Sequence, residues 1–301
     1  MQAPQTGHRL FRGILLMLLA ALAFSVMNVL IRAASQQLHA FEIAFFRNVF
    51  GLLFMLPWFL KYGMDVIKTA RLPLFFIRAV LGLISMLCFF WGLTVLPLAK
   101  AVALGFTVPL FVTVGAALVL KEDVHMRRWL AVVVGFIGTL IILRPSVDGD
   151  LLPSLVVILS AVTMAISVLI IKNLSRTERP NTIVIFMVLI MTPLSFPVAL
   201  TVWQWPDAWT WVLLILLGFS GSLGHLLFTH AIRSSEVSLV MPFDFARLPF
   251  VIVLAWLLFD ESVDRWTLIG AAVVFASGAY IAHREAQLNR RRARVLKASS
   301  Q

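Results

Sequence analysis

Charged residues are scarce in this sequence. Only 13% of the 301 residues are Asp, Glu, Lys or Arg, and 61% are hydrophobic. A typical soluble domain carries about 25% charged residues. So few charges cannot cover the surface of a water-soluble protein of this length, and the composition therefore argues against any soluble fold.

Cysteine is nearly absent as well. The single residue, Cys88, excludes an internal disulfide framework and any multi-cysteine metal site. His225 and His230 are five residues apart with no other metal-ligand spacing nearby, so we expect neither a metal nor a cofactor. The glycine pattern at 221–224 lacks the setting of a nucleotide loop, and there is no Walker lysine. The chain is therefore expected to be neither an enzyme nor an ATP-driven pump.

Long apolar runs, in contrast, fill the sequence. A transmembrane helix needs about 20 mostly apolar residues. Ten such runs follow one another: Phe11–Ile31, Phe41–Leu60, Leu74–Val95, Ala101–Leu120, Trp129–Leu143, Leu151–Ile171, Thr182–Val202, Trp209–Ile232, Val237–Phe259 and Trp266–Ala282. Backbone groups in lipid must be satisfied internally, so we predict an all-α membrane protein with ten transmembrane helices. The first run is too long for a signal peptide and ends without an A-x-A-like site, so we expect it to be retained.

The net charge of +11 is unevenly distributed along the chain. If the N-terminus is cytoplasmic, eighteen of the 25 Lys and Arg residues lie on the inside, and only Arg32, Lys100, Arg144 and Arg265 lie outside. The positive-inside rule therefore predicts cytoplasmic termini in a bacterial inner membrane, with a basic cytoplasmic tail at 284–301. The excess positive charge marks this side of the membrane, and no nucleic-acid partner is expected.

The two halves of the chain resemble each other at a shift of about 140 residues. Arg32 corresponds to Lys172, Pro109 to Pro249, Glu122 to Glu261 and Gly138 to Gly278. Each unit has five spans, which is an odd number, so the second unit must enter the membrane in the opposite orientation. Inverted repeats are the structural basis of alternating access, and this favours a transporter over a duplication retained for stability alone.

Several motifs carry a resemblance to a known family. They are Arg78-Ala79-Val80-Leu81-Gly82, Phe90-Trp91-Gly92-Leu93, Leu96-Pro97-Leu98-Ala99-Lys100-Ala101, Pro109, Lys121-Glu122 and Gly135-Phe136-Ile137-Gly138, with a weaker copy at Ser234-Ser235-Glu236-Val237, Pro249, Asp260-Glu261 and Gly270 to Gly278. On these residues the chain resembles the EamA-domain members of the drug/metabolite transporter superfamily, with repeats at 11–143 and 151–283. The resemblance implies ten helices, a central cavity near the midplane and transport of small organic solutes without ATP hydrolysis.

Ionisable residues inside the spans are candidates for function, because each costs roughly 2.5–3.5 kcal/mol on insertion scales. Asp244 and Arg247 lie three residues apart on one face of the ninth span, where they can pair. The equivalent positions of the fourth span, 104–108, are uncharged. A feature present in one half only is not required by the shared fold, so we favour a substrate or coupling role over a structural ion pair.

The remaining charges have competing interpretations. Arg47 either binds an anionic group or anchors an interface, and Glu42, five residues away, lies on a different face. Arg78 lies near the cytoplasmic end of its span and is expected to snorkel to the headgroups. Lys100 and Glu236 occupy matching positions that would suit charged gates, but we favour the simpler interpretation that Lys100 is solvated.

Uncharged residues complete the predicted substrate site. His225 either relays protons and binds substrate, or packs against the small residues that precede it. Trp91, Phe106 and Phe243 lie in helices that line the cavity in the family, where their rings can stack on a planar ligand. Asn28 in the first span is a further polar candidate, because a buried amide needs a partner.

The sequence therefore predicts a secondary transporter of a small organic metabolite. An aromatic lining with an Asp/Arg pair suits a solute with a planar part and a polar or charged part, and the resemblance implies vitamin- or cofactor-like solutes such as riboflavin or S-adenosylmethionine. Export of amino acids or drugs is the alternative. A membrane enzyme or lipid flippase is disfavoured because no acid, base or metal cluster lies at an interface. The expected partners are a small-molecule substrate and the lipid bilayer, and a homodimer is left open.

Overall fold

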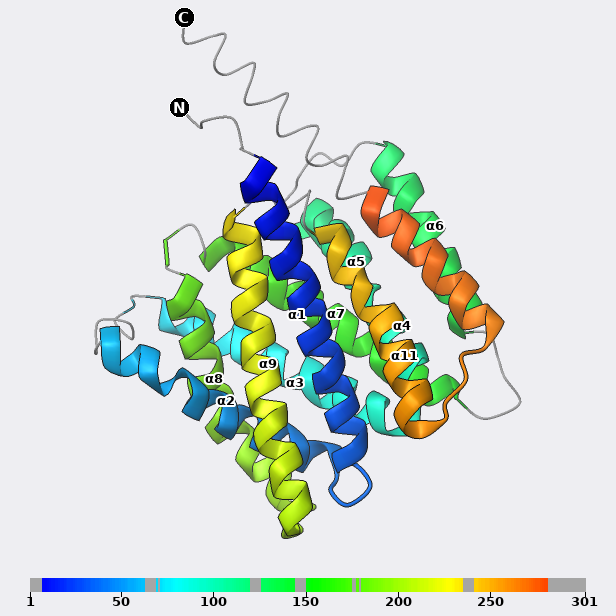
Figure 1. Ribbon diagram of the computed structural model, residues 1–301. Helices are drawn as coiled ribbons and strands as arrows, with labels where there is room; N and C mark the ends of the chain where they lie inside the picture. The colour runs from blue at the N-terminus through cyan, green and yellow to red at the C-terminus, as the bar shows by residue number, and fades with distance from the viewer. Residues whose placement is uncertain are drawn as a thin grey trace, which may run out of the picture.

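The computed structural model is entirely helical in its regular structure over the residues it describes. These are residues 7–62, 69, 71–119, 126–143, 150–174, 177–178, 180–234 and 241–280. Figure 1 shows an elongated bundle in which α1 begins, and residues 265–280 end, at the same end of the molecule. The predicted tail at 284–301 and the repeat residues Glu122 and Glu236 lie outside the described residues.

Each half of the chain contributes one series of helices. The first comprises α1 (Gly7–Ala34), α2 (Ala40–Tyr62), α3 (Leu72–Val95), α4 (Leu98–Gly105), α5 (Val108–Val119) and α6 (Met126–Leu143). The second comprises α7 (Leu151–Leu174), α8 (Pro180–Leu200), α9 (Ala208–Ser234), the 3₁₀ helix η2 (Met241–Ala246), α11 (Arg247–Phe259) and the helix at residues 265–280. Within the described ranges, seven segments are long and apolar enough to cross a membrane, beside shorter apolar helices such as α6. The prediction of an all-α, multi-pass membrane protein is confirmed.

Two of the predicted spans are interrupted helices, a feature that the hydropathy pattern did not predict. The fourth span breaks at Phe106–Thr107, between α4 and α5, and the ninth changes from η2 to α11 at Arg247. Pro109 and Pro249 follow these two points by two residues. A proline cannot donate the i→i−4 hydrogen bond and clashes with the preceding turn, so each proline accounts for the break just before it. The breaks occupy equivalent positions in the two repeats.

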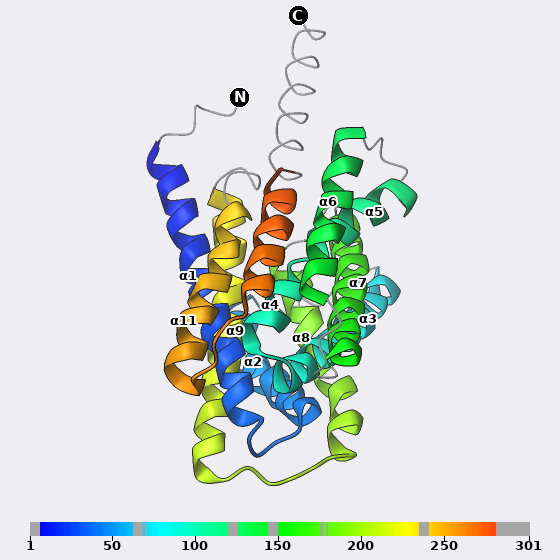
Figure 2. The same cartoon turned by 90° about the vertical axis from the view of Figure 1, so that its right-hand side faces the viewer.

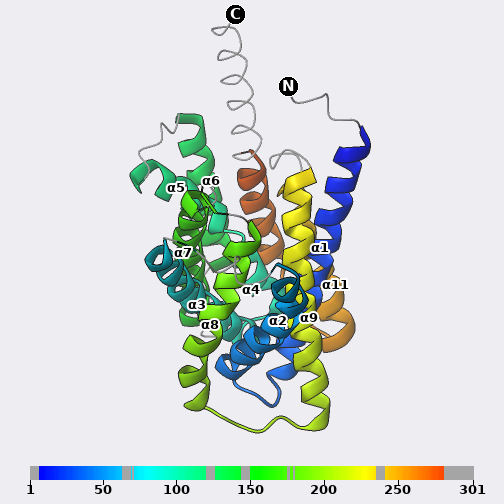
Figure 3. The ribbon, with the colours of Figure 1, turned by 90° about the vertical axis from the view of Figure 1, so that its left-hand side faces the viewer.

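The packing of the helices repeats with the same symmetry. The most extensive contact, α1 with α9, is matched by α3 with α7, its equivalent in the other half. Likewise α1 with α11 is matched by α7 with α5, and α2 with α9 by α8 with α3. Figure 3 shows α3 and α7 on one side of the molecule and α1 and α9 on the other, and α2 packs against α8, α9 and α3. The bundle therefore consists of two interlocked inverted repeats and not of two separate halves.

The last helices of the two repeats, α6 and residues 265–280, contact each other at glycine residues. Figure 2 shows residues 265–280 alongside α6, and Ser277 Oγ donates to the carbonyl of Ala131. A Cβ on Gly138 would lie 2.9 Å from the carbonyl oxygen of Gly270, and one on Gly270 would lie 2.7 Å from that of Gly138. Only glycine permits this backbone approach, so the two helices pack closely with antiparallel direction.

Acidic caps begin two of the second-repeat helices. Asp207 precedes α9, and the N–H of Thr210 donates to its Oδ1 at 2.7 Å. This bond lowers the pKa of the Asp207 carboxyl. Asp264 precedes the final helix and accepts from the N–H groups of Trp266 and Thr267 at 2.9 and 3.1 Å. Both carboxylates satisfy N–H groups that have no partner within the helix.

Candidate functional site

The break in the ninth span carries the predicted ion pair. Asp244 lies in η2, and Arg247 is the first residue of α11. Arg247 Nη2 donates to Asp244 Oδ1 at 2.7 Å, and the side chains are 23% and 16% exposed. The pair is therefore neither sealed in the core nor fully at the surface, and it stays within reach of a small molecule. Arg247 Nε is buried without a hydrogen-bond partner, which leaves one donor for a ligand.

Aromatic rings from the first repeat surround this guanidinium. Arg247 Cζ lies 4.5 Å from the centroid of the Phe24 ring and 6.0 Å from that of Phe106. Phe106 in turn packs against Phe245 with a centroid distance of 4.6 Å and an interplanar angle of 30°. Ser25 Oγ donates to the Arg247 carbonyl at 3.1 Å and so fixes α1 to the start of α11. The first repeat supplies the rings and the second supplies the charges, so the site lies where the repeats meet.

His225 of α9 joins this group to a second set of charges. Its ring packs edge-on against Phe24 with a centroid distance of 5.1 Å. Gly221, one helical turn earlier on the same face of α9, lies beside Arg47, because a Cβ on Gly221 would be 3.3 Å from Arg47 Nε. The structure therefore brings the predicted residues Arg47 and His225 into the neighbourhood of Arg247. Both interpretations of His225 stay open, since it is packed and also borders the charged group.

Arg47 is buried and has no carboxylate partner among the described residues. Its Nη1 donates to Asn48 Oδ1 at 3.2 Å, and Asn48 Nδ2 donates to Ser195 Oγ at 3.3 Å. Glu42 does not neutralise it, because Glu42 Oε1 instead accepts the backbone N–H of Gln204 at 3.2 Å. Arg47 thus carries an uncompensated charge inside the bundle.

Arg78 does not snorkel to the headgroups as the sequence suggested. It is 7% exposed, and its Nη2 donates to the sulfur of Met187 on α8 at 3.5 Å. Its Nε is buried without a hydrogen-bond partner. The side chain turns inward because α3 packs against α7 and α8, which places this face of α3 in the bundle and not in lipid. The sequence could not reveal this, because it does not show which face of a uniformly apolar span is covered.

The other predicted site residues are placed unequally. Asn28 is buried, and both polar atoms of its amide are unpaired; it lies one turn beyond Phe24 on the same face of α1. Trp91 packs against the main apolar core, and no ring contact or hydrogen bond joins it to Asp244 or Arg247 within the part of the chain described. Phe243 neighbours Asp244 in η2 and is 36% exposed. The structure thus places Asn28 closer to the predicted group than Trp91.

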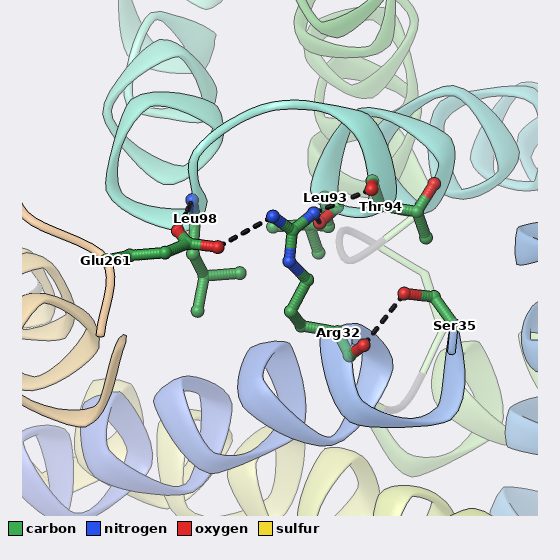
Figure 4. Close-up of polar contacts among 6 residues, drawn as sticks. All are labelled: Arg32, Ser35, Leu93, Thr94, Leu98 and Glu261. Atoms are coloured by element: carbon green, nitrogen blue, oxygen red, sulfur yellow. Dashed lines mark hydrogen bonds and ion pairs between the residues drawn. The ribbon is translucent and has the colours of Figure 1, made fainter. Parts of the chain in front are cut away.

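A polar network that the sequence did not predict ties the repeats together at the end where α1 finishes (Figure 4). Arg32 Nη1 donates to the carbonyls of Leu93 at 3.2 Å and Thr94 at 2.6 Å, and its Nη2 donates to Glu261 Oε1 at 2.6 Å. Glu261 Oε2 accepts the N–H of Leu98 at 2.8 Å. The sequence repeat identified Arg32 and Glu261 individually, each with an equivalent in the other half. Their ion pair could not be predicted, because it depends on the tertiary fold.

Lys100 is not solvated, contrary to the interpretation favoured from the sequence. It is 7% exposed, and its Nζ lies 3.2 Å from Asp150 Oδ2. This second bridge links α4 of the first repeat to the start of α7 in the second. Both bridges border a small cavity of about 190 Å³ whose lining includes Pro97, Lys100, Asp150 and Glu261. Two salt bridges therefore join the repeats at this end of the bundle.

Comparison with known proteins places the chain among transporters. A model of the EamA-like transporter family matches residues 11–144 and 151–282. The chain is 34% identical over 289 residues to a riboflavin transporter of Vibrio cholerae, covering 94% of this chain and 97% of that protein. It is 30% identical over 273 residues to an S-adenosylmethionine uptake transporter of Rickettsia conorii, covering 91% and 93%.

Two further matches bear on direction and fold. A pseudopaline exporter of Pseudomonas aeruginosa is 29% identical over 264 residues, which cover 87% of this chain and 93% of that protein. A solved crystal structure superimposes with a TM-score of 0.65 at 18% identity, covering 91% of this chain and 97% of the other. At that identity the superposition supports the fold alone.

Proposed function

Because the chain belongs to the EamA-like transporter family, whose matched relatives are transporters and not enzymes, we propose that it carries a vitamin- or cofactor-like solute across the bacterial inner membrane. Riboflavin and S-adenosylmethionine are the substrate candidates, since relatives named for these two compounds match nearly the whole chain. The carrier works by alternating access between its two inverted repeats.

One observation carries this proposal, namely the ion pair between aromatic rings at a helix break. Asp244 and Arg247 offer an acceptor and a donor, and Phe24 and Phe106 offer two aromatic rings beside the guanidinium. A flavin or an adenine ring can stack on such faces while its polar atoms bind the charged pair. Discontinuous helices at matched positions of two repeats are a common setting for transporter sites. The pair and the break coincide at Arg247.

The salt bridges at the other end supply the gate that alternating access requires. The charge distribution predicts that α1 ends on the outer side, where Arg32 and Lys100 bridge to Glu261 and Asp150. Because these bridges join the repeats, we propose that they hold this end closed. Opening this end must break them.

Export is the second candidate direction. The similarity to the pseudopaline exporter favours it, because an exporter, a riboflavin transporter and an S-adenosylmethionine uptake transporter all match this chain at comparable identity. The same site and gates serve both directions, since the direction of net flux follows the gradients and the coupling ion.

Uptake by intact cells tests the proposal. Bacteria lacking the chain, with and without the gene on a plasmid, are supplied with radiolabelled riboflavin or S-adenosylmethionine, with and without a proton uncoupler. We expect accumulation above the plasmid-free background for at least one compound. Inside-out vesicles measure the opposite direction. Failure to move either compound in both preparations would contradict the proposed substrate class.

A further inference from the structure

Arg47 of α2, Arg78 of α3 and Arg247 of α11 are arginines within the described helices. Helices α2 and α3 pack against each other and against α8, where Asn48, next to Arg47, bonds to Ser195 and Arg78 bonds to Met187. Asp244 pairs with Arg247 at 2.7 Å. Glu42 bonds instead to the backbone N–H of Gln204, which lies in the connection between α8 and α9. Arg247 therefore has a carboxylate within ion-pair distance, whereas Arg47 and Arg78 have none among the described residues.

Neither of these two arginines has a carboxylate partner among the described residues that would offset the cost of its burial. Arg47 is 6% exposed and Arg78 is 7% exposed, and no carboxylate lies within ion-pair distance of either one in the described ranges. Arg78 Nε is buried without an acceptor, and its Nη2 has only a thioether sulfur at 3.5 Å. A buried guanidinium without a counter-charge is unfavourable, particularly within a membrane. A permanent structural role does not account for two of them.

The packing around Arg47 keeps its guanidinium close to the α9 backbone. A Cβ on Gly221 would lie 3.3 Å from Arg47 Nε and 3.6 Å from Nη2. Gly221 precedes His225 by one helical turn on the same face of α9. His225 packs edge-on against Phe24, whose ring lies under Arg247. Arg47 therefore lies beside α9 one helical turn from His225, whose ring contacts the Phe24 ring next to Arg247.

We propose that Arg47 and Arg78 form an anion-binding subsite that selects solutes with a carboxylate or a phosphate ester. The inference rests on the proposed transport function and narrows its substrate class. The solute places its planar ring near Phe24 and Phe106 and its anionic group beside the two free arginines. Guanidinium groups bind both kinds of anion through paired N–H donors, so the two anions share one recognition chemistry. The bound anion supplies the missing counter-charge.

Two pairs of compounds, each differing in its anionic group, test this subsite. Riboflavin and flavin mononucleotide differ by a phosphate, and decarboxylated S-adenosylmethionine and S-adenosylmethionine differ by a carboxylate. Equilibrium binding of all four is measured on the purified full chain in lipid nanodiscs. We expect at least tenfold tighter binding of the anionic member in one pair, and which pair shows it identifies the anion. Equal or weaker binding of both anionic members would overturn the proposal.

Variants test whether the tighter binding of the anionic compound depends on the two arginines. Arg47→Gln and Arg78→Gln should each reduce it, and the double variant should abolish it. Arg71→Gln is the matched control, because Arg71 is more exposed and bonds to Asn173 and Thr177 away from the bundle centre. Thermal unfolding without ligand should show the Gln variants to be at least as stable as the wild type. A preference that survives in the double variant would overturn the proposal, and Arg47→Lys with Arg78→Lys should partly retain the preference.

Failure of the substrate class is separable from failure of the subsite. If none of the four compounds binds, the proposed solutes are wrong, and the subsite is tested with inorganic phosphate and acetate against chloride at equal ionic strength. A rise in Tm of a few degrees in the wild type that is absent from the double variant supports the subsite. An equal response of the two proteins overturns it.

Discussion

Arg247 makes three contacts at once, two through its guanidinium and one through its backbone carbonyl. Its guanidinium donates to Asp244 at 2.7 Å and lies over the Phe24 ring at 4.5 Å, while its backbone carbonyl accepts from Ser25. A planar guanidinium can stack and donate sideways at the same time, whereas a lysine ammonium cannot. The type of cation at this position should therefore matter as much as its charge.

Arg247→Lys should retain the ion pair and lose the stacking. We expect transport to fall about tenfold, since a desolvated cation–π contact contributes roughly 1–2 kcal/mol. Initial rates in proteoliposomes measure the change. Arg71→Lys serves as the control and should transport at the wild-type rate. An unchanged rate in Arg247→Lys would show that the aromatic contact has no role in the solute site.

At the residue scale, the sequence predicted which charged residues belong to the candidate site better than it predicted the residues that contact them. The spacing of Asp244 and Arg247 is local, so their pairing could be inferred from helical periodicity alone. Phe24 was not predicted, because its contact with Arg247 joins the first span to the ninth. Arg78 was misassigned for the same reason, since its burial depends on α7 and α8 covering that face of α3.

Two helix breaks distinguish the fourth and ninth spans from the rest of the bundle. Each lies two residues before a proline, Pro109 or Pro249, and these prolines were visible in the repeat alignment. The sequence prediction nonetheless treated both spans as continuous, because prolines also occur inside continuous helices such as α2 and α8. Which proline breaks a helix depends on tertiary packing around the freed carbonyls.

Pro249→Ala tests whether the break serves function at the expense of stability. The alanine restores the backbone N–H and removes the ring clash with the preceding turn, so η2 and α11 can join, and we expect slower transport with an unchanged or higher unfolding temperature. Pro57→Ala in α2 is the matched control and should raise stability without slowing transport. Thermal unfolding and initial rates are measured on the same preparations. A Pro249→Ala protein with wild-type transport would remove the break from the mechanism.

The contact between α6 and residues 265–280 makes a separate prediction about stability. Gly270→Ala places a Cβ 2.5 Å from Ile142 Cγ1 and 2.7 Å from the Gly138 carbonyl. Such overpacking should cost about 1–3 kcal/mol of unfolding free energy. Gly82→Ala is the control, because its nearest neighbour, the Met191 sulfur, lies at an ordinary 3.7 Å. Equal stability of the two variants would show that the helices can move apart freely.

Inverted symmetry organises the molecule as a whole. The equivalence of α1–α9 with α3–α7 was implicit in the sequence repeat, and so was the number of helices. The salt bridges were not, because pairing Arg32 with Glu261 and Lys100 with Asp150 requires knowing which ends of the two repeats meet. Hydropathy and charge thus predict the architecture, while the contacts that close one end depend on the assembled fold.

Weakening the salt bridges at one end of the bundle should shift the carrier toward the state that is open at that end. In a Cys88→Ser background, Asn28→Cys reports access to the bundle centre, since Asn28 is buried one turn from Arg32. We expect Glu261→Gln to increase labelling of this cysteine by a membrane-impermeant maleimide applied outside, because it breaks the bridge to Arg32. Glu122, the repeat equivalent of Glu261, lies outside the described residues, and inverted symmetry predicts the opposite effect for Glu122→Gln. Labelling that is unchanged in both variants would contradict the gating role.

The central claim is that the ion pair at the ninth-span break binds the transported solute. Its most direct test is solute flux through purified wild-type and Asp244→Asn protein reconstituted in liposomes, with Glu178→Gln as a control carboxylate that bonds to Thr69 away from the site. We predict that Asp244→Asn inserts and unfolds like the wild type but transports nothing above empty liposomes, while Glu178→Gln transports normally. Wild-type flux through Asp244→Asn would contradict the account.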